Sequence, residues 1–181
     1  MAERWITEYF CPVKDFQNIF DKSLKMHSMG VENSRILNYI ATESQKLLDE
    51  GSAVSILLID KTGKLRNGAS PSLPQDYLRA IDGIAPDPNI GTCAAAAATG
   101  NVVVTQSFLA DDKWSELKHF PLSLGYSGAW SVPIKNDQNV VLGTIGVYQK
   151  DIKSPPDLTV EGIQLLSSAA GQILSAATRI S

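Results

Sequence analysis

Cysteine, histidine and an excess of charge are all scarce in this sequence, and each shortage excludes a class of protein. Two cysteines and two histidines among 181 residues are too few for a secreted disulfide scaffold or for a typical metal cluster. The 16 basic and 19 acidic residues leave a formal net charge of −3, which argues against nucleic acid as the main partner.

Long apolar runs are also missing. No segment approaches the roughly 18 consecutive apolar residues that a membrane span needs. The first ten residues carry Glu3, Arg4 and Glu8 and have no apolar core, so they do not read as a signal peptide. We therefore expect a soluble cytoplasmic protein that does not bind a membrane.

Motifs that hold a cofactor are absent as well. His27 and His119 do not lie in a set with metal-ligand spacing. No cysteine is followed by a histidine, and no phosphate-binding glycine loop is present. We expect no metal and no cofactor.

The most distinctive stretch that is present runs over residues 91–100, Gly-Thr-Cys-Ala-Ala-Ala-Ala-Ala-Thr-Gly. Its alanines favour a helix, with Thr92 expected as N-cap and Gly100 as the end. Such a short helix needs packing, and alanines allow a close approach. Its first N–H groups could bind an anion, or could lower the pKa of Cys93.

Periodicity predicts an α+β fold with two hairpins and hence antiparallel pairing. Helices are expected near residues 12–24, 33–50, 74–81, 92–100, 114–124 and 159–181, and strands near 54–59, 64–69, 102–105, 126–134 and 140–148. No repeat or linker divides the chain. We assign residues 1–49 to N-terminal helices and 50–181 to the main domain, as one structural unit.

Four motifs occur at a distinctive spacing: Gly-Thr-Cys-Ala-Ala-Ala at 91–96, Trp114, Ala-Trp-Ser-Val-Pro-Ile at 129–134, and Val-Leu-Gly-Thr at 141–144. Together they resemble a GAF domain of bacterial signalling proteins, over about residues 50–180. The resemblance implies a six-stranded antiparallel sheet with helices on both faces. It also implies a ligand pocket between one sheet face and residues 73–125, with the alanine helix in its wall.

The resemblance supplies candidate ligand-binding residues around that pocket. For Trp114 and Trp130, ordinary core packing is the competing interpretation. Tyr77 and Tyr148 are weaker candidates, because a buried hydroxyl could be satisfied by another protein group. Some standalone GAF proteins are nitrate receptors that hold nitrate mostly through backbone N–H groups, so the ligand could be a small anion such as nitrate. The candidates are Tyr77, Gly91, Cys93, Ala94, Ala95, Trp114 and Trp130.

Cys93 also raises an enzymatic alternative, because free methionine-(R)-sulfoxide reductases are GAF enzymes with a cysteine in this motif. Those enzymes carry a further cysteine before the fourth strand, whereas residues 119–129 here contain none. Cys11 lies outside the matched part. Two-thiol reduction therefore lacks an evident resolving partner, and we expect no enzymatic activity.

The last predicted helix has apolar residues spaced 3, 4, 3, 4, 3, which is a heptad seam. The seam either docks on the protein's own sheet and helices or joins two copies, and we expect a homodimer. The overall expectation is a sensory domain that binds a small ligand and signals to a separate partner, such as a sensor kinase. A redox enzyme and a ligand-free dimerisation module are the alternatives. The seam residues are Ile163, Leu166, Ala170, Ile173, Ala177 and Ile180.

Overall fold

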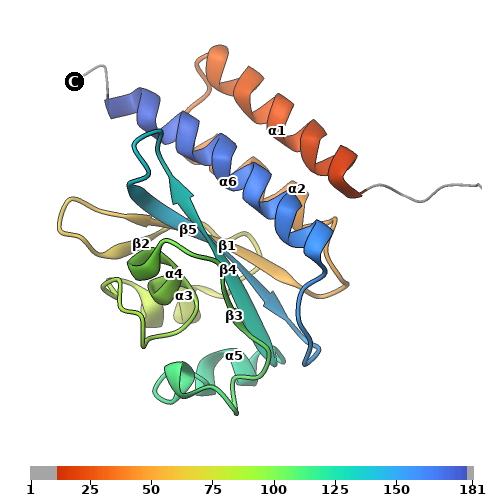
Figure 1. The fold of residues 1–181 in the computed structure, drawn as a ribbon, viewed down its shortest axis with the longest axis vertical. Coiled ribbons are helices and arrows are strands. Elements are labelled where there is room, and N and C mark those ends of the chain that lie inside the picture. Colours follow the sequence, from red (N-terminus) through yellow and green to blue (C-terminus); the bar gives the residue numbers. More distant parts are fainter. Residues whose placement is uncertain (1–11, 179–181) are drawn as a thin grey trace, which may run out of the picture.

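The computed structural model describes residues 12–178, in which five strands form one antiparallel sheet between two layers of helices (Figure 1). The strand order is β2-β1-β5-β4-β3, and every neighbouring pair is antiparallel. The α+β class is therefore confirmed. The strands are β1 (Ala53–Ile59), β2 (Leu65–Ala69), β3 (Val103–Thr105), β4 (Gly128–Lys135) and β5 (Val141–Gln149).

The strand count corrects one expectation, because the resemblance implied six strands and residues 12–178 form five. Between β3 and β4 the chain turns instead into the 3-10 helix η1 (Asp112–Trp114) and the short helix α5 (His119–Ser123). The Asp111 carboxylate caps η1 by accepting from the Lys113 N–H at 3.1 Å. The Phe108 N–H donates to the Ser127 carbonyl at 2.8 Å, which closes this excursion back onto the start of β4.

Helices α1 (Pro12–Ser28), α2 (Asn33–Gln45) and α6 (Asp157–Thr178) cover one face of the sheet. Figure 1 shows α1 lying alongside α6, while α2 is partly hidden behind α6 in this view. None of the described helices combines the length and apolar character that a membrane crossing requires. Burial of apolar surface between these helices and the strands stabilises the layer. Its buried side chains include Phe16, Ile36, Ile40, Val54, Trp130, Ile145, Ile163 and Ile173.

The heptad seam of α6 lies inside this layer. Ile163, Leu166, Ala170 and Ile173 are each fully buried within the chain's own core, so this seam cannot also join a second copy. The prediction that these residues of α6 form a dimer interface is therefore wrong, while the homodimer itself stays a prediction. The side chain of Ala177 and the whole of Ile180 lie outside the described residues.

Helices α3 (Gln75–Ile81) and α4 (Cys93–Thr99) lie on the opposite face, together with η1 and α5. Helix α4 packs closely on the sheet at Cys93, since a Cβ added at Gly146 of β5 would lie 2.7 Å from the Cys93 sulfur. Gly100 ends α4 as predicted, with φ +67° and its N–H donating to the Ala96 carbonyl at 2.9 Å.

Local details of the helix starts differ from the predictions. Thr92 lies at the N-cap position of α4 as predicted, but its side chain makes no capping hydrogen bond and its backbone is already helical. Helix α2 begins at Asn33 with Glu32 at its N-cap position, and it ends at Gln45 rather than near residue 50. Helix α6 begins at Asp157 rather than near residue 159. The order and type of the elements otherwise follow the predicted pattern.

Candidate ligand pocket

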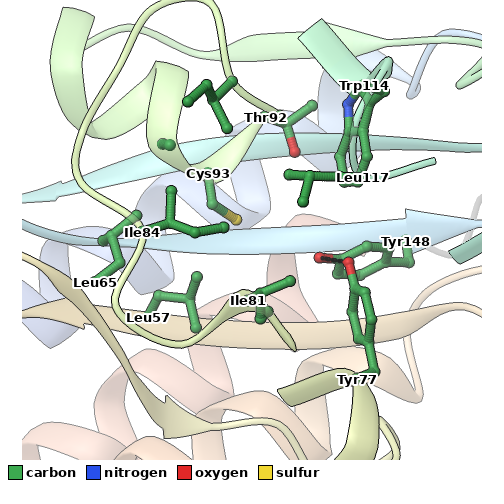
Figure 2. Close-up of a pocket in the computed structure, with 13 residues that line it drawn as sticks. Leu57, Leu65, Tyr77, Ile81, Ile84, Thr92, Cys93, Trp114, Leu117 and Tyr148 are labelled. Atoms are coloured by element: carbon green, nitrogen blue, oxygen red, sulfur yellow. Dashed lines mark hydrogen bonds between the residues drawn. The ribbon is translucent and has the colours of Figure 1, made fainter. Parts of the chain in front are cut away.

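A cavity of about 30 Å³ lies between the sheet and the α3–α4 layer (Figure 2). A space of this size admits a water molecule or a ligand of only a few atoms. The walls come from α3, the loop that leads into α4, the start of α4, the segment around η1, and strands β1, β2 and β5. The lining residues are Leu57, Leu65, Tyr77, Ile81, Ile84, Ile90, Gly91, Thr92, Cys93, Ala94, Trp114, Leu117 and Tyr148.

The loop between α3 and α4 is fixed at both ends by backbone hydrogen bonds. At its start the Leu65 N–H of β2 donates to the Ile84 carbonyl, and the Gly83 N–H donates to the Leu65 carbonyl, both at 2.9 Å. At its end Gly91 adopts φ +55°, a conformation that favours glycine, and its N–H donates to the Lys113 carbonyl at 2.8 Å. The loop is thereby held over the cavity as a wall.

The cavity offers little to a charged ligand. No Lys, Arg or His is among the described residues that line it, so the desolvation of an ion there would not be offset by an opposite charge. The N–H of Gly91, one donor expected for an anion, is already used by Lys113. The lining therefore favours a neutral and largely apolar molecule.

A tyrosine pair supplies one polar feature. The Tyr77 hydroxyl of α3 donates to the Tyr148 hydroxyl of β5 at 2.8 Å, and the two rings meet edge to face. Figure 2 shows both oxygens meeting at one side of the cavity. Burial raises the pKa of both hydroxyls, so the pair is neutral at physiological pH.

Trp114 supplies a second polar feature. Its side chain is buried against Phe108, with ring centroids 4.3 Å apart. Its indole Nε1 is buried, and no group of the described residues accepts its hydrogen bond. A buried donor without a partner is unusual and calls for a physical explanation.

Cys93 is held as a hydrogen-bonded thiol. Its sulfur lies 3.1 Å from the Ser131 hydroxyl, which itself donates to the Thr92 hydroxyl at 2.9 Å. Burial raises the pKa of the Cys93 thiol, and the neighbouring hydroxyls offset only part of that increase. Of the two alternatives for the helix start, the one in which it lowers the pKa of Cys93 is therefore not supported. Cys11 lies outside the described residues.

The structure brings together five of the seven predicted site residues: Tyr77, Gly91, Cys93, Ala94 and Trp114 all line the cavity. Their contact with a ligand stays a prediction. Of the other two, Ala95 is buried in α4 away from the lining, and Trp130 lies in the core on the opposite face of the sheet. Successive residues of a strand face opposite sides, so Ser131 faces α4 and Trp130 cannot.

Several lining residues were missed by sequence reasoning. The aliphatic ones come from β1, β2, the end of α3 and two loops, and nothing in their local sequence marks them as neighbours of Cys93. Two isoleucines in the proline-containing loop, Ile84 and Ile90, carried a usable signal, since apolar side chains in a polar loop usually pack onto something. The missed residues are Leu57, Leu65, Ile81, Ile84, Ile90, Thr92 and Leu117, together with the weaker candidate Tyr148.

Comparison with known proteins identifies the fold family. The family model described as "GAF domain" matches residues 34–176. The chain belongs to the GAF family. The matched region begins in α2 and so includes that helix with the sheet and the pocket layer.

A curated relative is the methyl sulfide methyltransferase-associated sensor of Methanosarcina acetivorans, which is 31% identical over 152 residues. These residues cover 83% of this chain but only 15% of that protein, so the chain spans a small part of its relative's length. The similarity concerns one region of that sensor rather than the whole protein.

Solved structures share the fold at low identity. The GAF domain of a phosphoenolpyruvate-protein phosphotransferase from Coxiella burnetii aligns with a TM-score of 0.72 at 11% identity, covering 92% of this chain and 96% of that one. The free methionine-R-sulfoxide reductase of Neisseria meningitidis aligns with a TM-score of 0.71 at 14% identity, covering 93% of each chain. At these identities the likeness concerns the GAF fold alone.

Proposed function

We propose that this GAF domain is a sensory module whose cavity binds a small, neutral and largely apolar molecule. The observation that carries the proposal is the cavity itself, which is lined almost wholly by aliphatic and aromatic side chains. It lies beneath the loop between α3 and α4, which backbone hydrogen bonds hold in place. Apolar pockets with a few polar groups are the usual sites for small ligands. The sensory role also agrees with the name of the Methanosarcina relative.

The geometry favours a neutral ligand over the anion expected from the sequence. Nitrate would have to leave water for a cavity that has no cationic side chain in its lining. Nitrate therefore serves as the charged competitor in the test. Haem and cyclic nucleotides are far larger than this space.

Sensing is favoured over thiol chemistry for reasons that lie at Cys93. A nucleophilic cysteine needs a lowered pKa and access to substrate, whereas this thiol is buried, hydrogen-bonded to Ser131, and raised in pKa. Substrates as large as methionine sulfoxide exceed the cavity. The reductase alternative therefore has no support from the arrangement around the sulfur.

A signal would cross the sheet to the helix layer. Tyr148 lines the cavity, while its neighbour Val147 lies in the opposite core and pairs in register with Trp130. A shift of β5 on ligand binding would thus change the packing of α6, and through it of α1, provided that the ligand favours one arrangement of the helices. We propose that a partner protein, such as a sensor kinase or a second copy of this chain, reads that layer.

The test is a thermal-unfolding screen of the purified protein with acetone, acetonitrile, dimethyl sulfide, nitrate, nitrite and free methionine sulfoxide. A ligand present at 100 times its dissociation constant adds about 2.7 kcal/mol to the stability. We expect a rise in melting temperature with acetone, acetonitrile and dimethyl sulfide, and none with the anions or with methionine sulfoxide. A rise with nitrate alone would restore the anion interpretation, and no rise with any compound would favour the ligand-free module.

A matched pair of variants places the response in the cavity. Ala94→Val adds two methyl groups to the cavity wall, whereas Ala98→Val adds the same groups on the exposed side of the same helix. Both changes carry a similar helix-propensity cost. The ligand response is expected to disappear in Ala94→Val and to persist in Ala98→Val. An equal response in both variants would place the ligand elsewhere.

A further inference from the structure

We propose that the ligand of this cavity carries a hydrogen-bond acceptor, and that the indole N–H of Trp114 binds it and sets the specificity. This inference rests on the proposed function and narrows it to a chemical class. The class is a small neutral molecule with a short apolar body and one acceptor atom. That atom is the oxygen of a carbonyl or sulfoxide, or the nitrogen of a nitrile.

The first argument is the state of the donor. An indole nitrogen can only donate, and Trp114 is 3% exposed with Nε1 fully buried and unmatched by any acceptor in residues 12–178. Leaving such a donor unpaired is unfavourable. A ligand acceptor would remove that penalty, whereas a purely apolar ligand of the same shape would leave it in place.

The second argument is the direction in which the donor lies. A Cβ built on Gly91 would meet the indole atoms Cζ2 and Cε2 at 3.7 and 3.9 Å, and Cε2 is bonded to Nε1. The nitrogen edge of the ring therefore faces the chain that enters α4. Figure 2 shows this nitrogen on the side of the ring turned toward Thr92 and the other lining residues.

The third argument is what surrounds the donor. The Thr92 hydroxyl already accepts from Ser131, and the Tyr148 hydroxyl accepts from Tyr77 while keeping its own proton available for donation. The polar groups near the cavity thus provide donors for a ligand, and the remaining walls are aliphatic. An acceptor flanked by methyl or methylene groups matches this arrangement.

The test compares acetonitrile with propyne, two linear molecules of three heavy atoms that differ in whether one end accepts a hydrogen bond. Ligands of three heavy atoms bind at best in the millimolar range. Binding is followed in solution by the indole N–H resonances of protein labelled with ¹⁵N at tryptophan, assigned with Trp114→Phe and Trp130→Phe. The Trp130 resonance serves as an internal control, because its ring lies across the sheet.

We expect acetonitrile to bind about tenfold more tightly than propyne, and to move the Trp114 N–H proton downfield. In Trp114→Phe the two affinities should become equal, while Trp130→Phe keeps the difference. The wild-type downfield shift is a second readout that does not depend on the folding of the variants.

Two contrary results have different meanings. Equal affinities in the wild-type protein, with no downfield shift on acetonitrile, would overturn the role of Trp114 and leave the apolar cavity as a binding site. No saturable change with either molecule would overturn the proposed function and this inference together.

Discussion

The hydroxyl of Tyr77 donates a 2.8 Å hydrogen bond to the hydroxyl of Tyr148, which is 71 residues further along the chain. Tyr77 belongs to α3 and Tyr148 to β5, so this bond fastens the pocket layer to the centre of the sheet. The rings also meet edge to face with centroids 5.7 Å apart, a geometry that adds to their burial. The position of α3 over the cavity therefore depends on a contact that no local pattern specifies.

Removal of one hydroxyl at a time tests this link. Tyr148→Phe leaves the Tyr77 O–H buried without its acceptor and should lower the free energy of unfolding by about 1–3 kcal/mol. Tyr77→Phe should cost about 1 kcal/mol, and the double variant should cost less than the sum of the two. Urea unfolding measures all three. Tyr39→Phe, which keeps its ring beneath Lys22, is the control and should change stability by less than about 0.5 kcal/mol.

Burial of the Cys93 thiol should make the stability of the protein depend on pH. The test uses a Cys11→Ser background, in which Cys93 is the only cysteine. The folded pKa of Cys93 is raised, so its stabilising contribution is complete below the unfolded thiol pKa of about 8.5 and is lost as pH rises above it. The free energy of unfolding should therefore fall between about pH 8.5 and 9.5, and fall less when Cys93→Ala is added. Over this pH range the tyrosines of the unfolded chain, with a pKa of about 10, stay mostly protonated in both proteins.

Thiol labelling gives an independent check on the same protein. Iodoacetamide should modify Cys93 of the folded Cys11→Ser protein much more slowly than in the urea-unfolded protein at pH 8, because the reagent needs both thiolate and access. Fast labelling of the folded protein would revive the redox enzyme as an interpretation of this cysteine.

Patterns that depend on neighbouring residues were predictable from the sequence. The β1–β2 hairpin follows from an apolar run and a turn in which Gly63 has φ +78°, and the end of α4 follows from Gly100. The alternation of β4 was equally readable. It places Ser131 and Trp130 on opposite faces of the sheet. Only the contact between Ser131 and Cys93 shows that Ser131 lies on the pocket side and Trp130 in the other core.

Features that depend on contacts distant in sequence were not predictable. The heptad spacing of α6 is the same whether the seam meets a second helix or the chain's own sheet, and only the packing against Phe16 and the strands decides it. The cavity likewise joins side chains from β1, β2, β5 and two loops. The sixth strand came from the resemblance, since the residue pattern itself contains five.

The close packing of α4 on the sheet can be tested by a substitution at Gly146. A methyl group there would lie 2.7 Å from the Cys93 sulfur and 3.3 Å from the Ser131 hydroxyl oxygen. Gly146→Ala should therefore destabilise the protein by about 1–3 kcal/mol through overpacking. In a Cys93→Ala background the cost should shrink, because the smaller side chain leaves room. A cost that is equal in both backgrounds, measured by urea unfolding, would show that the sulfur is not the obstacle.

A substitution at Ile173 tests whether the apolar seam of α6 packs in the core of one chain or joins two copies. Its side chain is fully buried between the sheet and the helices of one chain, so Ile173→Lys should place a charge in apolar surroundings and cost more than about 3 kcal/mol. Gln172→Lys adds the same charge on the exposed side of the helix and should have little effect. Circular dichroism and sedimentation of both variants distinguish the roles. Loss of folded structure in Ile173→Lys places the seam in the core, whereas a folded monomer replacing a wild-type dimer would show that the seam joins two copies.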